Sequence, residues 1–180
     1  MSSLCRNRLA FLGKNQAGFT LIEVMIAVLV LSIGLLGLAG LQVTALQNNQ
    51  SAFMRSQATA FAYDLADRMR SNVPGVTAGF YDPANAAQTA DCLTTTGCSV
   101  EELAEHDLSE WSAALAGNLP MGQGTVCIDS TPGDGADAAN AACDGSGTQW
   151  TVKIWWDEDK DGVISTTANN MERLEISFTL

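Results

Sequence analysis

The stretch that decides the fold is GFTLIE at residues 18–23, which opens an apolar run that continues to Leu41. Between Val24 and Leu41 the only side chain with a hydrogen-bonding group is Ser32. With the preceding apolar residues included, such a run is just long enough to cross a hydrocarbon core of about 30 Å as a helix. A carboxylate within a membrane helix costs roughly 2.5–3.5 kcal/mol on insertion scales, so we interpret Glu23 as functional.

Charge is distributed unevenly along this 180-residue chain, which has room for one globular domain beside a long helix. Three of its nine basic residues, Arg6, Arg8 and Lys14, precede the apolar run, and no acidic residue does. Beyond residue 18, six basic residues face 20 acidic ones, a net charge of −14. Such an acidic body is a poor partner for nucleic-acid phosphates. The basic leader predicts a cytoplasmic N-terminus and an exported body.

The cysteines divide in the same way, with Cys5 in the leader and four others in the exported part. Four cysteines in an oxidising compartment predict two disulfides, and three connectivities are open. We favour Cys92–Cys98 and Cys127–Cys143, because each pair closes a short loop of small residues. A zinc site or free thiols are the alternatives, but the sequence has no C-x-x-C pair and only one histidine.

The residue before the apolar run suggests a cleavage site. An ordinary secretory signal is cut after its apolar core, whereas here the small residue Gly18 precedes the core. A cut after Gly18 would keep the apolar helix and expose Phe19 as a new N-terminus. The alternative is an uncleaved signal anchor in which Gly18 and Glu23 have no special role.

The sequence GFTLIEV at residues 18–24 resembles the class III leader and N-terminus of type IV pilins and of type II secretion pseudopilins. This resemblance implies that a prepilin peptidase cleaves between Gly18 and Phe19 and N-methylates Phe19. It identifies Glu23 as the helix carboxylate used in assembly. The protein would then be a substrate of that peptidase and not an enzyme, with its single apolar helix in the inner membrane.

Physical chemistry supports a role for Glu23 in such an assembly. Cleavage would leave an amine on Phe19, which needs a counter-charge in a low-dielectric setting, and Glu23 of the same or a neighbouring subunit could supply it. Three glycines, Gly34, Gly37 and Gly40, weaken the second half of the apolar helix. They predict either local unwinding, as at the corresponding proline of major pilins, or close packing of helices.

Hydrophobic periodicity predicts the remaining elements. Apolar residues at helical spacing extend the first helix to Asn72, about 80 Å from Phe19, before Val73-Pro74-Gly75 ends it. The segment 73–98 should be irregular. Ser99 and Glu102 form a capping-box pattern for a helix that ends at Gly117.

Strict alternation predicts strands near the C-terminus. We expect a short strand at Thr125–Asp129, a loop at Ser130–Gly147, and an antiparallel hairpin that joins Trp150–Trp156 to Arg173–Leu180. The fold class is therefore α+β: a long N-terminal helix packed on a small antiparallel sheet, as in type IV pilins. The expected domains are a cleaved cytoplasmic leader (1–18), a long helix (19–72, transmembrane over 19–41) and a periplasmic globular domain (73–180).

Further motifs resemble a family of minor pilins, the type IV pilus modification proteins of PilV type. They are ADRMRSN at 66–72, DLSEW at 107–111 and Leu119-Pro120. This resemblance implies a low-abundance subunit that joins other minor pilins and the major pilin in a complex priming the pilus tip, where a tip adhesin is a further candidate partner. A minor pseudopilin of type II secretion is the nearest alternative.

The acidic segment DEDKDGVI at 157–164 matches the first part of an EF-hand loop. Asp157, Asp159 and Asp161 are the candidate calcium ligands, but Ala168 stands where the bidentate glutamate belongs. Glu172 could complete the shell. A solvated acidic loop without calcium is the alternative, and we expect no other cofactor.

No catalytic residues are expected. His106, the single histidine, is predicted on a helix surface between Glu105 and Asp107, without a nucleophile or an orienting partner. Trp155 alternates with its neighbours and is predicted to make a subunit contact. A membrane-anchored module that binds calcium or another ligand is the alternative to an assembly subunit.

Overall fold

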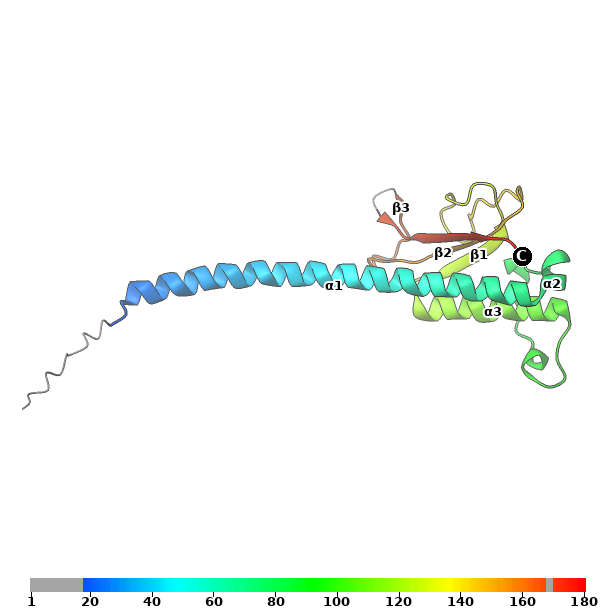
Figure 1. The fold of residues 1–180 in the computed structure, drawn as a ribbon, viewed down its shortest axis with the longest axis horizontal. Helices are drawn as coiled ribbons and strands as arrows, with labels where there is room; N and C mark the ends of the chain where they lie inside the picture. The colour runs from blue at the N-terminus through cyan, green and yellow to red at the C-terminus, as the bar shows by residue number, and fades with distance from the viewer. Residues whose placement is uncertain (1–17, 168–169) are drawn as a thin grey trace, which may run out of the picture. The chain divides into compact units, whose positions relative to one another are not determined.

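The computed structural model describes residues 18–167 and 170–180, drawn in Figure 1. The predicted leader up to residue 17 and the position of Ala168 lie outside this range. The chain divides into two compact units, residues 1–46 and 47–180. One helix, α1 (Leu21–Ser71), contributes to both units.

Helix α1 begins two residues after the predicted start and ends one residue before the predicted end. It is helical without interruption through Gly34, Gly37 and Gly40, so unwinding in an assembled state stays a prediction. Its N-terminal part is long and apolar enough to cross a membrane, and its most apolar 18-residue window is not buried within the molecule.

The end of α1 is set by Asn72, whose backbone leaves the helical region at φ −122° and ψ 51°. The Asn72 side chain accepts a hydrogen bond from the N–H of Gly75 at 3.3 Å and caps a short helix, α2 (Val73–Thr77). Pro74 fits there because the first turn of a helix needs no N–H donor at this position. The predicted stop is therefore right for α1, but the next residues form a further helical turn.

Helix α3 (Val100–Asn118) has the predicted capping box. The Ser99 hydroxyl accepts from the N–H of Glu102 at 3.2 Å, and the Glu102 carboxylate accepts from the N–H of Ser99 at 2.8 Å. The segment predicted as irregular contains two short 3₁₀ turns before α3, η1 (Pro83–Asn85) and η2 (Ala90–Leu93).

Three antiparallel strands form the main sheet in the order β1-β2-β5. They are β1 (Gln123–Ile128), β2 (Trp150–Trp155) and β5 (Arg173–Phe178), and the β2–β5 pairing confirms the predicted hairpin. A separate two-residue ladder joins β3 (Thr166–Thr167) to β4 (Asn170–Met171), which the sequence reasoning did not anticipate.

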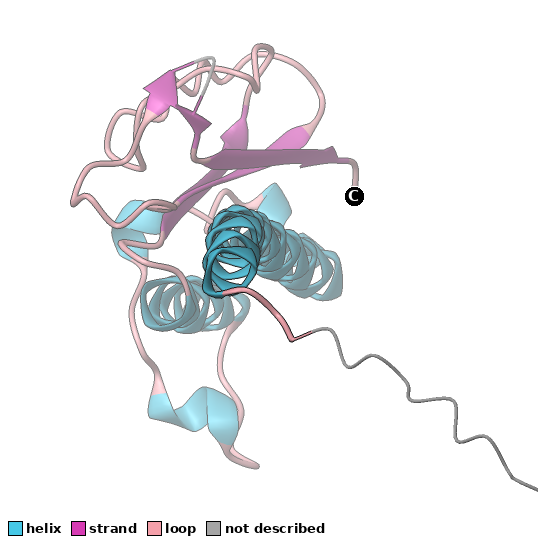
Figure 2. Cartoon of the chain, turned by 90° about the vertical axis from the view of Figure 1, so that its left-hand side faces the viewer, coloured by secondary structure: helices cyan, strands magenta, loops and turns pink. Residues whose placement is uncertain are grey.

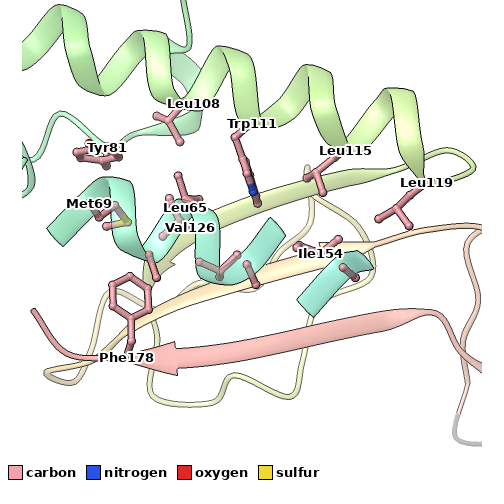
Figure 3. Close-up of a cluster of buried hydrophobic side chains, with 14 of the residues drawn as sticks. Leu65, Met69, Tyr81, Leu108, Trp111, Leu115, Leu119, Val126, Ile154 and Phe178 are labelled. Atoms are coloured by element: carbon pink, nitrogen blue, oxygen red, sulfur yellow. The ribbon is translucent and has the colours of Figure 1, made fainter. Parts of the chain in front are cut away.

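The inner face of the sheet packs on the helices of the second unit (Figures 2 and 3). Leu65 and Met69 of α1, with Trp111 and Leu115 of α3, meet the even-numbered side chains of the strands. The buried hydrophobic cluster begins at Met54. These layers give the predicted α+β architecture of a type IV pilin-like protein.

The outer face of the sheet is covered as well, and this overturns one prediction. Thr151, Lys153 and Trp155 on that face are each 0% exposed, because the segment 130–147 folds over them and binds Lys153. Trp155 is therefore a core residue of the domain and not an exposed subunit contact. The period-two pattern predicts a face open to solvent and carries no sign of a covering loop.

Candidate assembly site

The residues of the predicted processing and assembly site stand at the start of α1. Gly18 and Phe19 precede the helix, and the Phe19 side chain is 83% exposed in this chain. Thr20 begins the first turn, because its hydroxyl and carbonyl oxygens accept from the N–H of Glu23 at 3.3 and 3.1 Å. Glu23 lies in that turn, where the positive end of the helix dipole stabilises a carboxylate.

A continuous apolar surface follows Glu23 along α1. Its large aliphatic side chains from Val24 to Leu46 are at least half exposed, so the residues that the structure describes bury none of them. The hydroxyl of Ser32 donates to the carbonyl of Val28 at 2.6 Å, which satisfies its one polar group inside the helix. Burial of this segment needs a partner beyond the described part of the chain.

The four cysteines of the second unit lie in the two pairs favoured from the sequence. Cys92 pairs with Cys98 at a Cα–Cα distance of 4.8 Å, and Cys127 pairs with Cys143 at 6.2 Å. The second disulfide ties the end of β1 to the loop that covers the sheet.

Two buried cations of the sheet hold the same loop. The Lys153 ammonium lies 2.5 Å from Asp129 and 2.9 Å from Asp134, and it donates to the carbonyl of Ala141 at 2.8 Å. Arg173 donates to the carbonyls of Gly133 and Gly135. The hydrogen bond from Lys153 lowers the pKa of Asp134 below its ordinary value. The loop is thus fastened by one disulfide and by two charged side chains that the sequence reasoning did not single out.

The acidic segment brings together a different carboxylate set from the one predicted. Oxygens of Asp157, Asp159 and Glu172 lie within 4.8 Å of one another, and Asp161 is not part of this group. Asp157 and Glu172 are buried, at 3% and 0% exposure. Asp157 accepts from the N–H groups of Lys160 and Gly162, whereas Glu172 accepts from those of Glu158 and Ser165. Asp161 instead binds the N–H of Val163 at 2.8 Å.

His106 is buried, although the sequence predicts it on a helix surface. It is 5% exposed; its Nδ1 accepts from the N–H of Thr89 at 3.2 Å, and its Nε2 lies 3.4 Å from Glu110. This imidazole therefore docks the segment before η2 onto α3. No hydroxyl or thiol nucleophile is recorded as its partner among the described residues.

Arg68 organises the junction of α1 and α3. Its guanidinium binds Asp64 at 3.0 Å, Asp107 at 3.0 Å and Glu110 at 2.9 Å. Tyr81 donates its hydroxyl to Asp107 at 2.8 Å, and burial followed by this bond raises the pKa of Tyr81 above its ordinary value. The hydrogen bond from Arg68 lowers the pKa of Glu110.

The motifs at 66–72 and 107–111 thus meet in space. Asn72 donates from its side chain to the carbonyl of Val100 at 2.8 Å, and the Trp111 indole N–H donates to the carbonyl of Phe61 at 3.0 Å. With the Arg68 ion pairs, these bonds fix α3 against the end of α1. The sequence reasoning singled out both motifs but not their contact.

Comparison with known families gives matches over residues 13–109, which include α1 and the first part of α3 and end before the main sheet. A family model described as Type IV pilin Tt1218 matches residues 40–109, and a model described as Prokaryotic N-terminal methylation motif matches residues 13–39. No curated protein and no solved structure matches the chain significantly.

The long apolar helix, the sheet packed on it and the methylation motif define a pilin subunit. The chain is a type IV pilin-like protein. Its motif implies processing by a prepilin peptidase and assembly with other pilins, and its apolar helix fits a single-pass protein of the inner membrane. The likeness to pilins indicates a structural, non-enzymatic protein.

Proposed function

We propose that this chain is a minor pilin of PilV type, a low-abundance subunit of the complex that primes type IV pilus assembly, at or near the tip. The observation that carries the proposal is the placement of Gly18, Phe19 and Glu23 at the start of a helix whose large apolar side chains up to Leu46 are exposed among the described residues. The meeting of the 66–72 and 107–111 motifs at the α1–α3 junction supports the PilV subtype.

In this proposal the N-terminus starts in the cytoplasm and the domain of residues 73–180 is exported. The peptidase cuts between Gly18 and Phe19, and the amine of the methylated Phe19 pairs with Glu23 of its own or a neighbouring chain. Burying two opposite charges together costs less than burying either alone, so bundling of helices is favoured over dispersion in the membrane.

Mass spectrometry of the membrane form tests the processing step. We expect a mature chain that begins at N-methylated Phe19, and we expect Gly18→Leu to retain the leader. A wild-type chain that keeps its leader would contradict the proposal and support the uncleaved anchor.

Substitution of Glu23 tests the assembly step separately. Glu23→Ala should be inserted and processed normally, but should enter sheared pili at least fivefold less than wild type. Quantitative immunoblotting of pilus and membrane fractions measures this, with the exposed Glu101→Ala as control. Equal incorporation of both variants would rule out a charge role for Glu23.

The minor pseudopilin alternative is distinguished by phenotype. Deletion of the gene should reduce surface pili and leave type II secretion of exported enzymes unchanged. Loss of secretion with normal piliation would instead identify a pseudopilin.

We further propose that Asp157, Asp159 and Glu172 bind calcium. The observation in favour is that these carboxylates converge although they come from two separate segments, and that two of them are buried. Isothermal titration of the full chain with calcium should give saturable heat that Asp159→Asn reduces, whereas Asp137→Asn should not. Absence of heat in wild type would identify a plain acidic loop.

A further inference from the structure

The edge of β1 is the floor of a groove of about 650 Å³ in the second unit. Its floor is Thr125–Ile128. One wall is the segment 79–83 with Tyr81 and Pro83, and the opposite wall is the loop segment 139–143. The groove is therefore a slot with a wall on each side of β1. The edge of β1 offers a regular row of backbone hydrogen-bonding groups at its floor.

The direction of those backbone groups follows from the register. The N–H of Trp156 donates to the carbonyl of Glu172 at 3.2 Å, so even-numbered residues at this end of β2 point their backbone groups toward β5. Odd-numbered residues of β2 therefore face β1, where Lys153 pairs with Thr125 and Thr151 with Cys127. Along an antiparallel strand the backbone N–H and C=O groups of successive residues point to opposite sides. The backbone groups of Val126 and Ile128 therefore point away from β2.

A hydrogen bond between Gly145 and Ile128 agrees with this assignment. The carbonyl of Ile128 accepts from the N–H of Gly145 in the covering loop at 3.0 Å, on the side away from β2. Within the part of the chain that the structure describes, no partner outside the β1–β2 ladder is recorded for the N–H of Ile128, or for the N–H and carbonyl of Val126. The side chain of Val126 belongs to the buried hydrophobic cluster, and the residue also lines the groove. The backbone donor and acceptor of Val126 and the donor of Ile128 have the spacing of a strand edge that can pair with a further strand.

The charges in and around the groove indicate which kind of segment it binds. Asp82 is the one charged side chain that lines the groove, among the residues described. The surrounding unit, residues 47–180, carries six basic and 19 acidic residues. Its field therefore attracts a basic segment and repels an acidic one.

The edge strand β5 of a second copy of this chain is too thick to enter the groove. The open edge β5 is covered on one face by Arg70, whose guanidinium lies 5.3 Å from the Phe178 ring, and on the other by the loop that Arg173 binds. Because β5 is covered on both of its faces, it cannot enter a groove that has a wall on each side. An extended tail or loop without such covering layers fits between the two walls.

We propose that this groove binds an extended, basic segment of another polypeptide, which adds to β1 as a further strand. Its backbone would pair with Val126 and Ile128, and its alternate side chains would face Tyr81 and Pro83 on one side and residues 139–143 on the other. This surface is separate from the N-terminal helix, and the proposal does not depend on the position of the chain in a pilus.

Amide exchange of the full chain in detergent micelles, followed by NMR, tests the proposal. The probe is a seven-residue peptide of alternating threonine and valine with a lysine at each end. Binding should slow exchange at Val126 and Ile128 and leave Thr125 and Cys127 unchanged, since the latter already pair with β2. A peptide methylated on alternate amides, or one with glutamate at both ends, should bind at least tenfold more weakly.

Variants locate the site. Ala139→Trp fills the groove from an exposed position and should weaken binding at least tenfold, whereas the exposed Ala113→Trp on α3 should leave it unchanged. Equal binding by both variants, or no saturable binding by wild type, would overturn the proposal. Self-association that Ala139→Trp abolishes would overturn it in favour of a second copy, and equal affinity for the glutamate peptide would overturn the basic partner.

Discussion

Arg68 has three carboxylate partners, and two of them, Asp107 and Glu110, join α1 to α3. The side chain of Asp107 is only 9% exposed, so loss of its cation would leave a nearly buried charge whose remaining side-chain partner, among the described residues, is the Tyr81 hydroxyl. Unlike an isolated surface pair, such a group carries a desolvation penalty when its partner is removed.

Arg68→Ala is therefore expected to lower the free energy of unfolding by about 1–3 kcal/mol. Denaturant unfolding of the full chain in detergent measures the change. The control is Asp67→Asn, which breaks an exposed ion pair with Arg70 and should cost less than about 1 kcal/mol. Similar losses in both variants would contradict the role given to Arg68.

Glu110 gives the same junction a dependence on pH. Its pKa is lowered by the hydrogen bond from Arg68, so its contribution to stability is present above the ordinary glutamate pKa of about 4.3 and lost as the pH falls below it. The melting temperature should therefore fall less steeply between pH 6 and pH 3, a range set at about the ordinary pKa, in Glu110→Gln than in wild type. Parallel curves would show that this carboxylate does not contribute.

Among the elements, the loop over the outer face of the sheet is fastened in two ways, by a disulfide and by buried cations. The Cys127–Cys143 disulfide restricts it covalently, and Lys153 holds it through Asp129 and Asp134. Lys153 and Asp129 are both buried, so replacing Lys153 alone leaves the Asp129 carboxylate buried without its cation.

We expect Lys153→Met to lower the free energy of unfolding by about 3–5 kcal/mol and the double variant Cys127→Ser/Cys143→Ser to lower it by about 3 kcal/mol. Because both changes release one loop, their combination should cost less than the sum. A double-mutant cycle by chemical denaturation measures the coupling. Strict additivity would mean that the two fastenings act on separate parts of the domain.

The elements also show what the sequence could predict. Length and apolar composition predicted α1, the Ser99–Glu102 pattern predicted the start of α3, and strict alternation predicted β2 and β5, because each of these signals is local. Burial of Lys153, Trp155 and His106 was not predictable, since it depends on segments that are far away in sequence and have no periodicity. The convergence of Glu172 with Asp157 arises from the same kind of long-range contact.

At the scale of the whole molecule, the buried core and the exposed apolar helix surface lie in different units. Every member of the buried hydrophobic cluster lies at or beyond Met54, whereas the exposed aliphatic run lies before residue 47. The fold of the second unit therefore does not need the first.

A fragment of residues 47–180 should be soluble without detergent and should retain the amide NMR pattern of the domain. Its melting temperature should lie within a few degrees of the full chain, about the shift that 1 kcal/mol produces in a domain of this size. The full chain in detergent is the control. A fragment that is unfolded or aggregated would show that the N-terminal part of α1 contributes to the core.

The two kinds of fastening of the loop affect how the protein responds to proteolysis outside the cell. The surface-exposed positions between Cys127 and Cys143 are open to a protease. A single cut between Gly135 and Cys143 leaves both new ends attached, one through the disulfide and the other through Lys153 and Arg173. A nicked subunit would keep its sheet covered and its place among its neighbours, and the damage would be visible only on a reducing gel.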